Sequence, residues 1–277
     1  KNFKGKNDSD NNLEVSIQNV SQDKYLKLYK VKSNLVDYNI DTLENSLDFT
    51  HESENLFFGF EMSAHETLKT VSDDKYEYIL PEIILNKNLV SNKKFGSVDF
   101  QSNLKIHNYE TNKLEKFLVN DFDWKLREFK YKSGLKSKLL GNMKNVNYET
   151  NNVTKYKKDF TNEFFGAIGF LSEMDFFKKS RNNSNHLISP KFLLRYAPGH
   201  MRKEDEGPRL NHLNVFNLDR LNSFNNYENG LSATIGFDYE LDEKNKKIDI
   251  SLAQVINEKE NKKMPNTTSL NEKLSDV

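Results

Sequence analysis

The chain has 277 residues, of which 36% are hydrophobic and 30% charged, and its 41 basic residues balance its 41 acidic residues. This balance excludes the broad basic field with which proteins attract nucleic acid. The absence of cysteine excludes disulfides and thiolate metal sites. Aromatic residues make up 12% of the chain, and this content argues against a disordered polymer.

Apolar and polar residues alternate along most of the first half of the chain. This period predicts β-strands, because successive side chains of a strand point to opposite faces. Short polar stretches, such as 51–55 and 108–113, predict hairpin turns between the strands. The strand-like segments lie at residues 13–17, 43–50, 56–62, 98–106 and 129–132.

The second half continues the pattern and adds long connectors. Residues 230–241 alternate without error, and the alternation resumes at 248–252. Polar connectors occupy 178–186, 199–229 and 257–276, and a short helix is expected near 212–222. Loops of this length are unusual in a compact domain, whereas short turns at one end and long loops at the other are typical of outer-membrane barrels.

The alternation leaves two environments open for the apolar face, a protein core or lipid. A soluble sheet protein of this size needs a large core, for which 36% hydrophobic residues are few. A wide barrel needs no central core, because its lumen is wet and its outer surface is apolar. The test is Leu231, Ile235 and Phe237: if they were sealed in a dry interior shared with a second layer, the membrane interpretation would fail.

Five segments, in this order and spacing, carry a resemblance to a known family. They are YEYILPEIIL (76–85), ISPKFLLRYAPG (188–199), FNLDRLNSFNNYENGLSATIGFDYEL (216–241), ISLAQVI (250–256) and SLNEKLSDV (269–277). Together they resemble the β-barrel region of the LPS-assembly outer-membrane protein family, LptD. The segment DKYLKLYKV (23–31) is similar to an early part of that region.

The resemblance implies an all-β fold, an antiparallel up-and-down meander that is part of a large transmembrane β-barrel. Residues 1–277 would form a single β-barrel region, an internal fragment without the N-terminal periplasmic domain and the last strands. The implied role is non-enzymatic insertion of lipopolysaccharide into the outer leaflet of the Gram-negative outer membrane, without a cofactor. The implied partners are lipopolysaccharide, an outer-membrane lipoprotein that plugs the barrel and a periplasmic protein that bridges lipopolysaccharide to it. The lack of cysteine departs from family members whose domains are linked by disulfides.

The candidate site is the charged run Arg202, Lys203, Glu204, Asp205 and Glu206 in the long connector. Such a run is usually a solvated surface. The functional interpretation is contact with lipopolysaccharide phosphates and their bridging divalent cations, because basic side chains suit phosphate and carboxylates suit hard cations. The six histidines have no metal-ligand spacing, and no nucleophile-elbow or phosphate-binding glycine motif is present.

Residue type alone indicates roles for two prolines and for the tryptophan. Pro81 and Pro190 lie in apolar β segments and, lacking a backbone N–H, predict a strand start, a bulge or an edge; the alternative is a weakened pairing that helps a barrel open to lipid. Trp124 is expected in an aromatic girdle at the membrane interface or in a soluble core. The alternative functions are a porin-like channel or uptake receptor, a soluble β-sheet binding protein and, more distantly, a lipid-modifying barrel enzyme.

Overall fold

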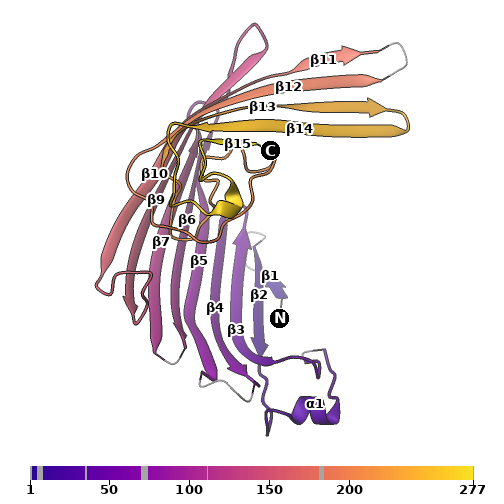
Figure 1. Cartoon of the computed structure of the whole chain (residues 1–277). Helices are drawn as coiled ribbons and strands as arrows, with labels where there is room; N and C mark the ends of the chain where they lie inside the picture. The colour runs from indigo at the N-terminus through magenta and orange to yellow at the C-terminus, as the bar shows by residue number, and fades with distance from the viewer. Residues whose placement is uncertain are drawn as a thin grey trace. The chain divides into compact units, whose positions relative to one another are not determined.

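The computed structural model describes residues 2–4, 9–34, 36–69, 74–110, 112–180 and 184–276. Among these residues, fifteen strands form one sheet in the order β1-β2-β3-β4-β5-β6-β7-β9-β10-β12-β13-β14-β15, with β8 paired to β9 and β11 to β12 (Figure 1). Within the described ranges the order begins at β1 and stops at β15, so this sheet is open. The expected all-β antiparallel meander is confirmed, and an open sheet is consistent with part of a barrel.

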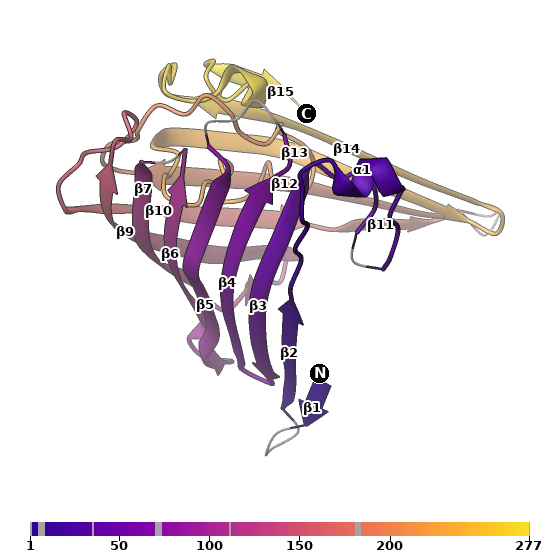
Figure 2. The same cartoon turned by 90° about the horizontal axis from the view of Figure 1, so that it is seen from below.

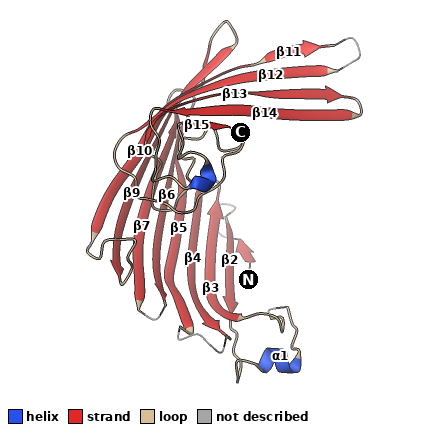
Figure 3. Cartoon of the chain, viewed as in Figure 1, coloured by secondary structure: helices blue, strands red, loops and turns tan. Residues whose placement is uncertain are grey.

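The strands are long, and Figure 3 shows how they dominate the chain. The first are β1 (Asn2–Lys4), β2 (Asp10–Ser16), β3 (Thr42–Ser53), β4 (Leu56–Thr67), β5 (Tyr76–Asn92), β6 (Gly96–Tyr109), β7 (Lys113–Lys125) and β8 (Phe129–Lys130). The others are β9 (Leu135–Asn151), β10 (Thr161–Met174), β11 (Phe176–Lys179), β12 (Asn185–Ala197), β13 (Gly230–Glu243), β14 (Lys246–Asn257) and β15 (Leu274–Asp276). The helices are α1 (Tyr25–Tyr29) and the 3-10 turn η2 (Asn266–Thr268).

The chain divides into two compact units, which we describe separately. Unit 1 comprises Lys1–Asn88, Phe100–Asn120 and Val146–Glu163, and unit 2 comprises Leu89–Asp99, Asp121–Asn145 and Phe164–Val277. No helix in the part of the chain that the structure describes is long and apolar enough to cross a membrane.

Unit 1 contains β1–β4 and most of β5, which pair in chain order (Figure 2). Apolar residues meet across the strands, because Leu13 lies opposite Phe49 and Phe49 opposite Phe60. On this face Leu13, Val15 and Leu47 are exposed, and Phe49 and Phe60 are half-buried. The connector between β2 and β3 contains α1 and packs a small core around Leu26, Leu43 and Leu68.

The two prolines, which lack a backbone N–H, differ in their place in the ladder. At Pro81 the register shifts between Glu61 and Ser63, so that β5 has an extra residue against β4. In β12, residues up to Ile188 pair with β11 and residues from Lys191 pair with β10. Pro190 lies between these two parts. The expected bulge is confirmed at Pro81. Pro190 lies inside β12 with no shift of register on either side, so it is neither a strand start nor a bulge.

Unit 2 shows an inverted sheet, in which the apolar face is the open one. On β13, Leu231, Ile235 and Phe237 are 39%, 53% and 37% exposed, whereas Ser232 and Thr234 are 3% and 1% exposed. The register carries this arrangement to both neighbours, because Thr234 lies opposite Leu193 on β12 and Val255 on β14, and both are buried. Leu231, Ile235 and Phe237 therefore point away from the protein interior, whereas Leu193 and Val255 are apolar residues of the buried face.

The connectors of unit 2 differ between the two ends of the strands. Residues 198–229 join β12 to β13 and residues 258–273 join β14 to β15, whereas β13 and β14 are joined at the other end by residues 244–245 alone. The expected long connectors are confirmed at 198–229 and at 258–273, whereas residues 274–276 form β15. The connector expected at 178–186 includes residues 181–183, which lie outside the described residues. Gly230 has a φ of 117°, which L side chains rarely adopt, so glycine suits the point where the connector enters β13.

The expected helix near 212–222 is wrong, because this stretch is a chain of turns. The side-chain oxygen of Asn211 accepts the backbone N–H groups of Leu213 and Asn214 at 2.8 and 3.2 Å. Asp219 accepts the N–H of Asn222 in the same way at 3.0 Å. Such local side-chain bonds compete with helical backbone bonds, and they are the physical reason for the difference.

Candidate functional site

The candidate site of unit 2 lies where its two long connectors cover the polar face of the sheet. The connectors share a hydrophobic core with β14, and Phe216 and Ala253 pack against it. Gly169 on β10 permits the close approach, because a Cβ at this position would lie 2.5 Å from Cδ2 of Leu218. The buried residues of this connector core are Met201, Leu210, Val215, Leu221, Val255, Met264 and Leu270.

Beneath the connectors two arginines converge on one carboxylate. Arg195 of β12 donates from Nε to the carbonyl of Leu218 at 2.6 Å and from Nη2 to the carbonyl of Glu228. Arg220 donates from Nε to Oε2 of Glu228 at 2.9 Å and from Nη2 to Oε1 of the same carboxylate. Its Nη2 also donates to Oγ of Ser232 at 3.0 Å. We call Arg195, Arg220 and Glu228 the arginine clamp.

A lysine on β9 makes a second attachment. Lys144 is buried and donates to the carbonyl of Ser223 at 2.6 Å. Its Nζ lies 3.5 Å from a carboxylate oxygen of Asp219 and 3.9 Å from one of Asp121 on β7. The connector 198–229 is thus held by charged side chains of β9 and β12.

Burial and charge set the protonation of this cluster. Burial by itself would raise the pKa of Glu228, but Arg195 and Arg220 together hold that pKa below its ordinary value. At Asp219 burial dominates and raises the pKa of the carboxyl, although Lys144 opposes the shift. Burial also raises the pKa of Tyr227, so this phenol is neutral. Removing one partner of such a buried pair typically costs about 3–5 kcal/mol.

The charged run at 202–206 does not form one surface. Asn226 binds the backbone of Arg202 through both amide atoms, at 3.2 and 2.9 Å, and donates to Oε1 of Glu204 at 2.9 Å. Glu204 is buried, and its N–H donates to the carbonyl of Lys263 at 2.9 Å. Arg202 therefore joins two parts of the 198–229 connector, and Glu204 joins that connector to residues 258–273. The other three residues, Lys203, Asp205 and Glu206, are exposed, and Lys203 lies 3.5 Å from Asp205.

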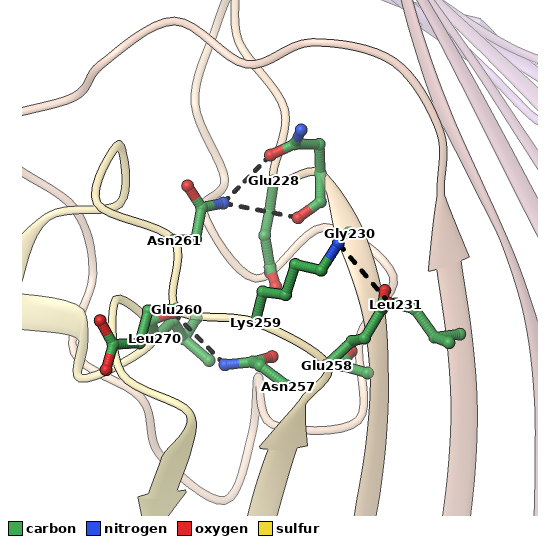
Figure 4. Close-up of a pocket in the computed structure, with 11 residues that line it drawn as sticks. Glu228, Gly230, Leu231, Asn257, Glu258, Lys259, Glu260, Asn261 and Leu270 are labelled. Atoms are coloured by element: carbon green, nitrogen blue, oxygen red, sulfur yellow. Dashed lines mark hydrogen bonds and ion pairs between the residues drawn. The ribbon is translucent and has the colours of Figure 1, made fainter.

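A polar pocket of about 220 Å³ lies between the connectors and the adjacent ends of β13 and β14 (Figure 4). Asn261 donates to the side-chain oxygen of Asn229 at 3.0 Å across it. Asn257 donates to the carbonyls of Leu270 and Glu272, at 3.4 and 2.8 Å. These amides hold the connectors in place, and Glu258, Lys259 and Glu260 supply charges around the opening.

Sequence reasoning did not assign Arg195, Arg220, Glu228 or Lys144 to a site. A signal was present, because Arg195 interrupts an apolar strand, and Asp219 and Arg220 are the only Asp, Glu, Lys or Arg residues between positions 210 and 227. Among the residues with described positions, no group of three or more His, Asp or Glu is arranged to hold a metal. Trp124 is 39% exposed and donates to the carbonyl of Phe95 at 3.2 Å, so it is not a core residue.

A sheet with an exposed apolar face, a buried polar face and long connectors packed on that polar face defines the wall of a membrane β-barrel protein. The family model LptD, LPS transport system D, matches residues 2–277. The chain therefore belongs to the LptD family, whose members are non-enzymatic components that insert lipopolysaccharide into the Gram-negative outer membrane. A search of curated proteins finds no match.

Membership confirms the expected family, the outer-membrane location and the role in lipopolysaccharide transport. It overrules the soluble binding protein, the porin-like channel and the lipid-modifying enzyme. The exposed Leu231, Ile235 and Phe237 agree with it, because lipid is the medium that such a face requires.

Proposed function

We propose that residues 1–277 act as one β-barrel region whose apolar face contacts acyl chains and whose polar face lines a hydrated lumen. The connectors 198–229 and 258–273 occupy part of that lumen beside β12–β14. The sugar portion of lipopolysaccharide passes the polar face, while its acyl chains remain with apolar surfaces. The observation that carries this proposal is the inverted burial on β13, where Ile235 is exposed and Thr234 is buried.

Two protein partners complete the proposed pathway. An outer-membrane lipoprotein fills the lumen as a plug, and a periplasmic bridge protein delivers lipopolysaccharide to the barrel. Both partners are what membership of the family implies. Of the charged run, Lys203, Asp205 and Glu206 remain the candidates for contact with lipopolysaccharide, because Arg202 and Glu204 are used to fasten the connectors.

Single-cysteine labelling tests the orientation, because the natural chain contains no cysteine. Leu252 is exposed on β14, and its neighbour Ser251 is half-buried and points to the other face. We expect a fluorophore on Leu252→Cys to be quenched by lipids with nitroxide-bearing acyl chains, and one on Ser251→Cys by aqueous iodide. Equal quenching of both positions by lipid would refute the proposal.

Photo-crosslinking tests the lipopolysaccharide contact. We expect a benzophenone side chain at Asp205 to crosslink to lipopolysaccharide in intact outer membranes. Leu213 is the matched control, because it is strongly exposed on the same connector but outside the charged run. Equal crosslinking from both positions would remove the charged run from the pathway.

A further inference from the structure

Four carboxylates lie side by side across four strands of unit 1. Glu14 on β2 lies directly opposite Asp48 on β3, and Asp48 lies directly opposite Glu61 on β4. Glu61 in turn lies directly opposite Glu82 on β5. Figure 2 shows β3, β4 and β5 side by side. We call these four residues the acidic row.

The acidic row is on the polar face of the sheet. Glu14 lies between Leu13 and Val15 in the sequence, and both of these side chains are exposed on the opposite, apolar face. Strands are about 4.8 Å apart, so the three gaps between the four residues span about 14 Å. The acidic row is therefore a line of charge that runs across the strands, which one point charge cannot neutralise.

The acidic row lowers the stability of the folded sheet, because like charges directly opposite each other are destabilising. Two of its members are partly compensated. Glu82 pairs with Lys105 at 2.9 Å, and Asp48 accepts the hydroxyl of Ser46 at 2.8 Å. Within the described ranges, neither Glu14 nor Glu61 makes an ion pair. The net charge of the row stays negative after this compensation.

Two buried oxygens beside the acidic row also lack donors. Ser63 is 1% exposed and lies two residues beyond Glu61 on the same face, and its Oγ has no hydrogen-bond partner. Asn103 is 8% exposed and donates from Nδ2 to Glu82 at 3.3 Å, which directs its amide at the row, yet its Oδ1 has no hydrogen-bond partner. Buried oxygens of this kind are normally satisfied. Asn103 Oδ1 and the carboxylates of the acidic row are acceptors that the described residues do not fully satisfy, which points to an occupant rich in N–H donors.

We infer that the acidic row docks a basic segment of the protein that occupies the barrel lumen. The inference rests on the proposed function, in which this face lines the lumen. Arginines at alternate positions of an extended segment lie about 6.7 Å apart, so three of them cover the roughly 14 Å of the row. Their guanidinium groups supply paired donors that match carboxylates.

The two other occupants fit less well. Lipopolysaccharide phosphates have the same sign of charge as the row and are repelled by it. A divalent cation needs oxygens that converge within about 2.3–2.6 Å of one point. The described carboxylates and histidines form no such group of three. An extended basic segment needs no convergence.

The test uses the purified full chain in detergent micelles and a fluorescent peptide, Arg-Ser-Arg-Ser-Arg, as the probe. The double variant Asp48→Asn with Glu61→Gln removes the centre of the row. The matched control is Glu240→Gln with Asp249→Asn, which removes a directly opposed acidic pair on β13 and β14. We expect the row variant to weaken peptide binding about tenfold or more, and the control to change it less than about twofold. The row variant should also unfold at a higher temperature than the wild type, because repulsion is relieved.

Equal peptide affinity for the row variant and the wild type would overturn the inference. So would calcium binding that the row variant abolishes while its peptide affinity is unchanged, because the row would then be a cation site. Cysteine labelling separates this failure from failure of the proposed function. If a probe on Glu61→Cys lay in lipid and one on Phe60→Cys in water, the lumenal assignment would fail together with the docking site. Normal labelling with unchanged peptide affinity would refute docking alone.

Discussion

Glu228→Gln is the most informative perturbation of the arginine clamp. The change is isosteric, yet it leaves the buried Arg195 and Arg220 without their shared counter-ion. Breaking a buried pair in this way costs about 3–5 kcal/mol, because the remaining charges are desolvated and uncompensated. We expect the free energy of unfolding to fall by that amount. We also expect faster tryptic cleavage after Arg209, because the clamp holds its connector.

The assay is guanidinium unfolding of the protein in micelles, followed through the fluorescence of Trp124, the only tryptophan and a residue of unit 2. Glu206→Gln is the matched control, because it removes the same charge from an exposed position of the same connector. Combining Arg220→Met with Glu228→Gln should restore about 1–3 kcal/mol relative to the sum of the single changes, since the two residues interact directly. A loss below about 1 kcal/mol for Glu228→Gln, or strict additivity in the double variant, would refute the reasoning.

The same clamp predicts the pH dependence of stability. The folded pKa of Glu228 lies below its ordinary value of 4.5, so its contribution is present above that value and is lost as the pH falls through the folded pKa. Asp219 has the opposite effect on the free energy of unfolding. Its pKa is raised on folding, so the folded state binds a proton more readily and the contribution of Asp219 to stability decreases as the pH rises. We expect the wild type to lose more stability below about pH 4.5 than Glu228→Gln does, and parallel curves in urea titrations would contradict this.

Further predictions concern the two faces of unit 2. Ile235→Lys places a charge on the lipid face and should lower the free energy of unfolding by about 2–4 kcal/mol if it lies near the midplane. Leu241→Lys at the strand end is the control and should lower it by about 0–1 kcal/mol. Equal unfolding midpoints of the two variants in vesicles would contradict the assigned face. Gly169→Ala should loosen the connector, because its Cβ would meet Leu218 at 2.5 Å, and Leu218→Ala should relieve the clash in a thermal melt of the double variant. Asn226→Ala leaves buried backbone groups without partners and should cost about 1–3 kcal/mol, with faster proteolysis of the connector as the second readout.

The sequence predicted the strands well where one face is apolar and the other polar. Alternation of period two requires no knowledge of distant contacts, which is why β13 and β14 could be located from residues 230–241 and 248–252 alone. The side to which each face turns could not be read from the pattern, because a soluble sheet alternates in the same way. Exposure of Ile235 and burial of Thr234 settle it in the structure.

The candidate site was predicted less well. The run at 202–206 was noticed because its charges are consecutive, but burial of Glu204 depends on Asn226, which lies more than twenty residues away. The arginine clamp likewise joins residues of a strand and a connector, so no local spacing reveals it. The expected helix near 212–222 failed for a local reason, because Asn211 and Asp219 bind nearby backbone groups in turns.

The connector core has a consequence for how this part of the protein can move. Its residues come from two different connectors and from β14, and Glu204 is hydrogen-bonded to Lys263 across them. The β12–β13 and β14–β15 pairs are thus joined at one end by the shared connector core. Sliding of β13 along β12 or β14 would have to break the contacts of the connector core. The core therefore resists shear between these strands, and any change in the sheet has to take place at other strands.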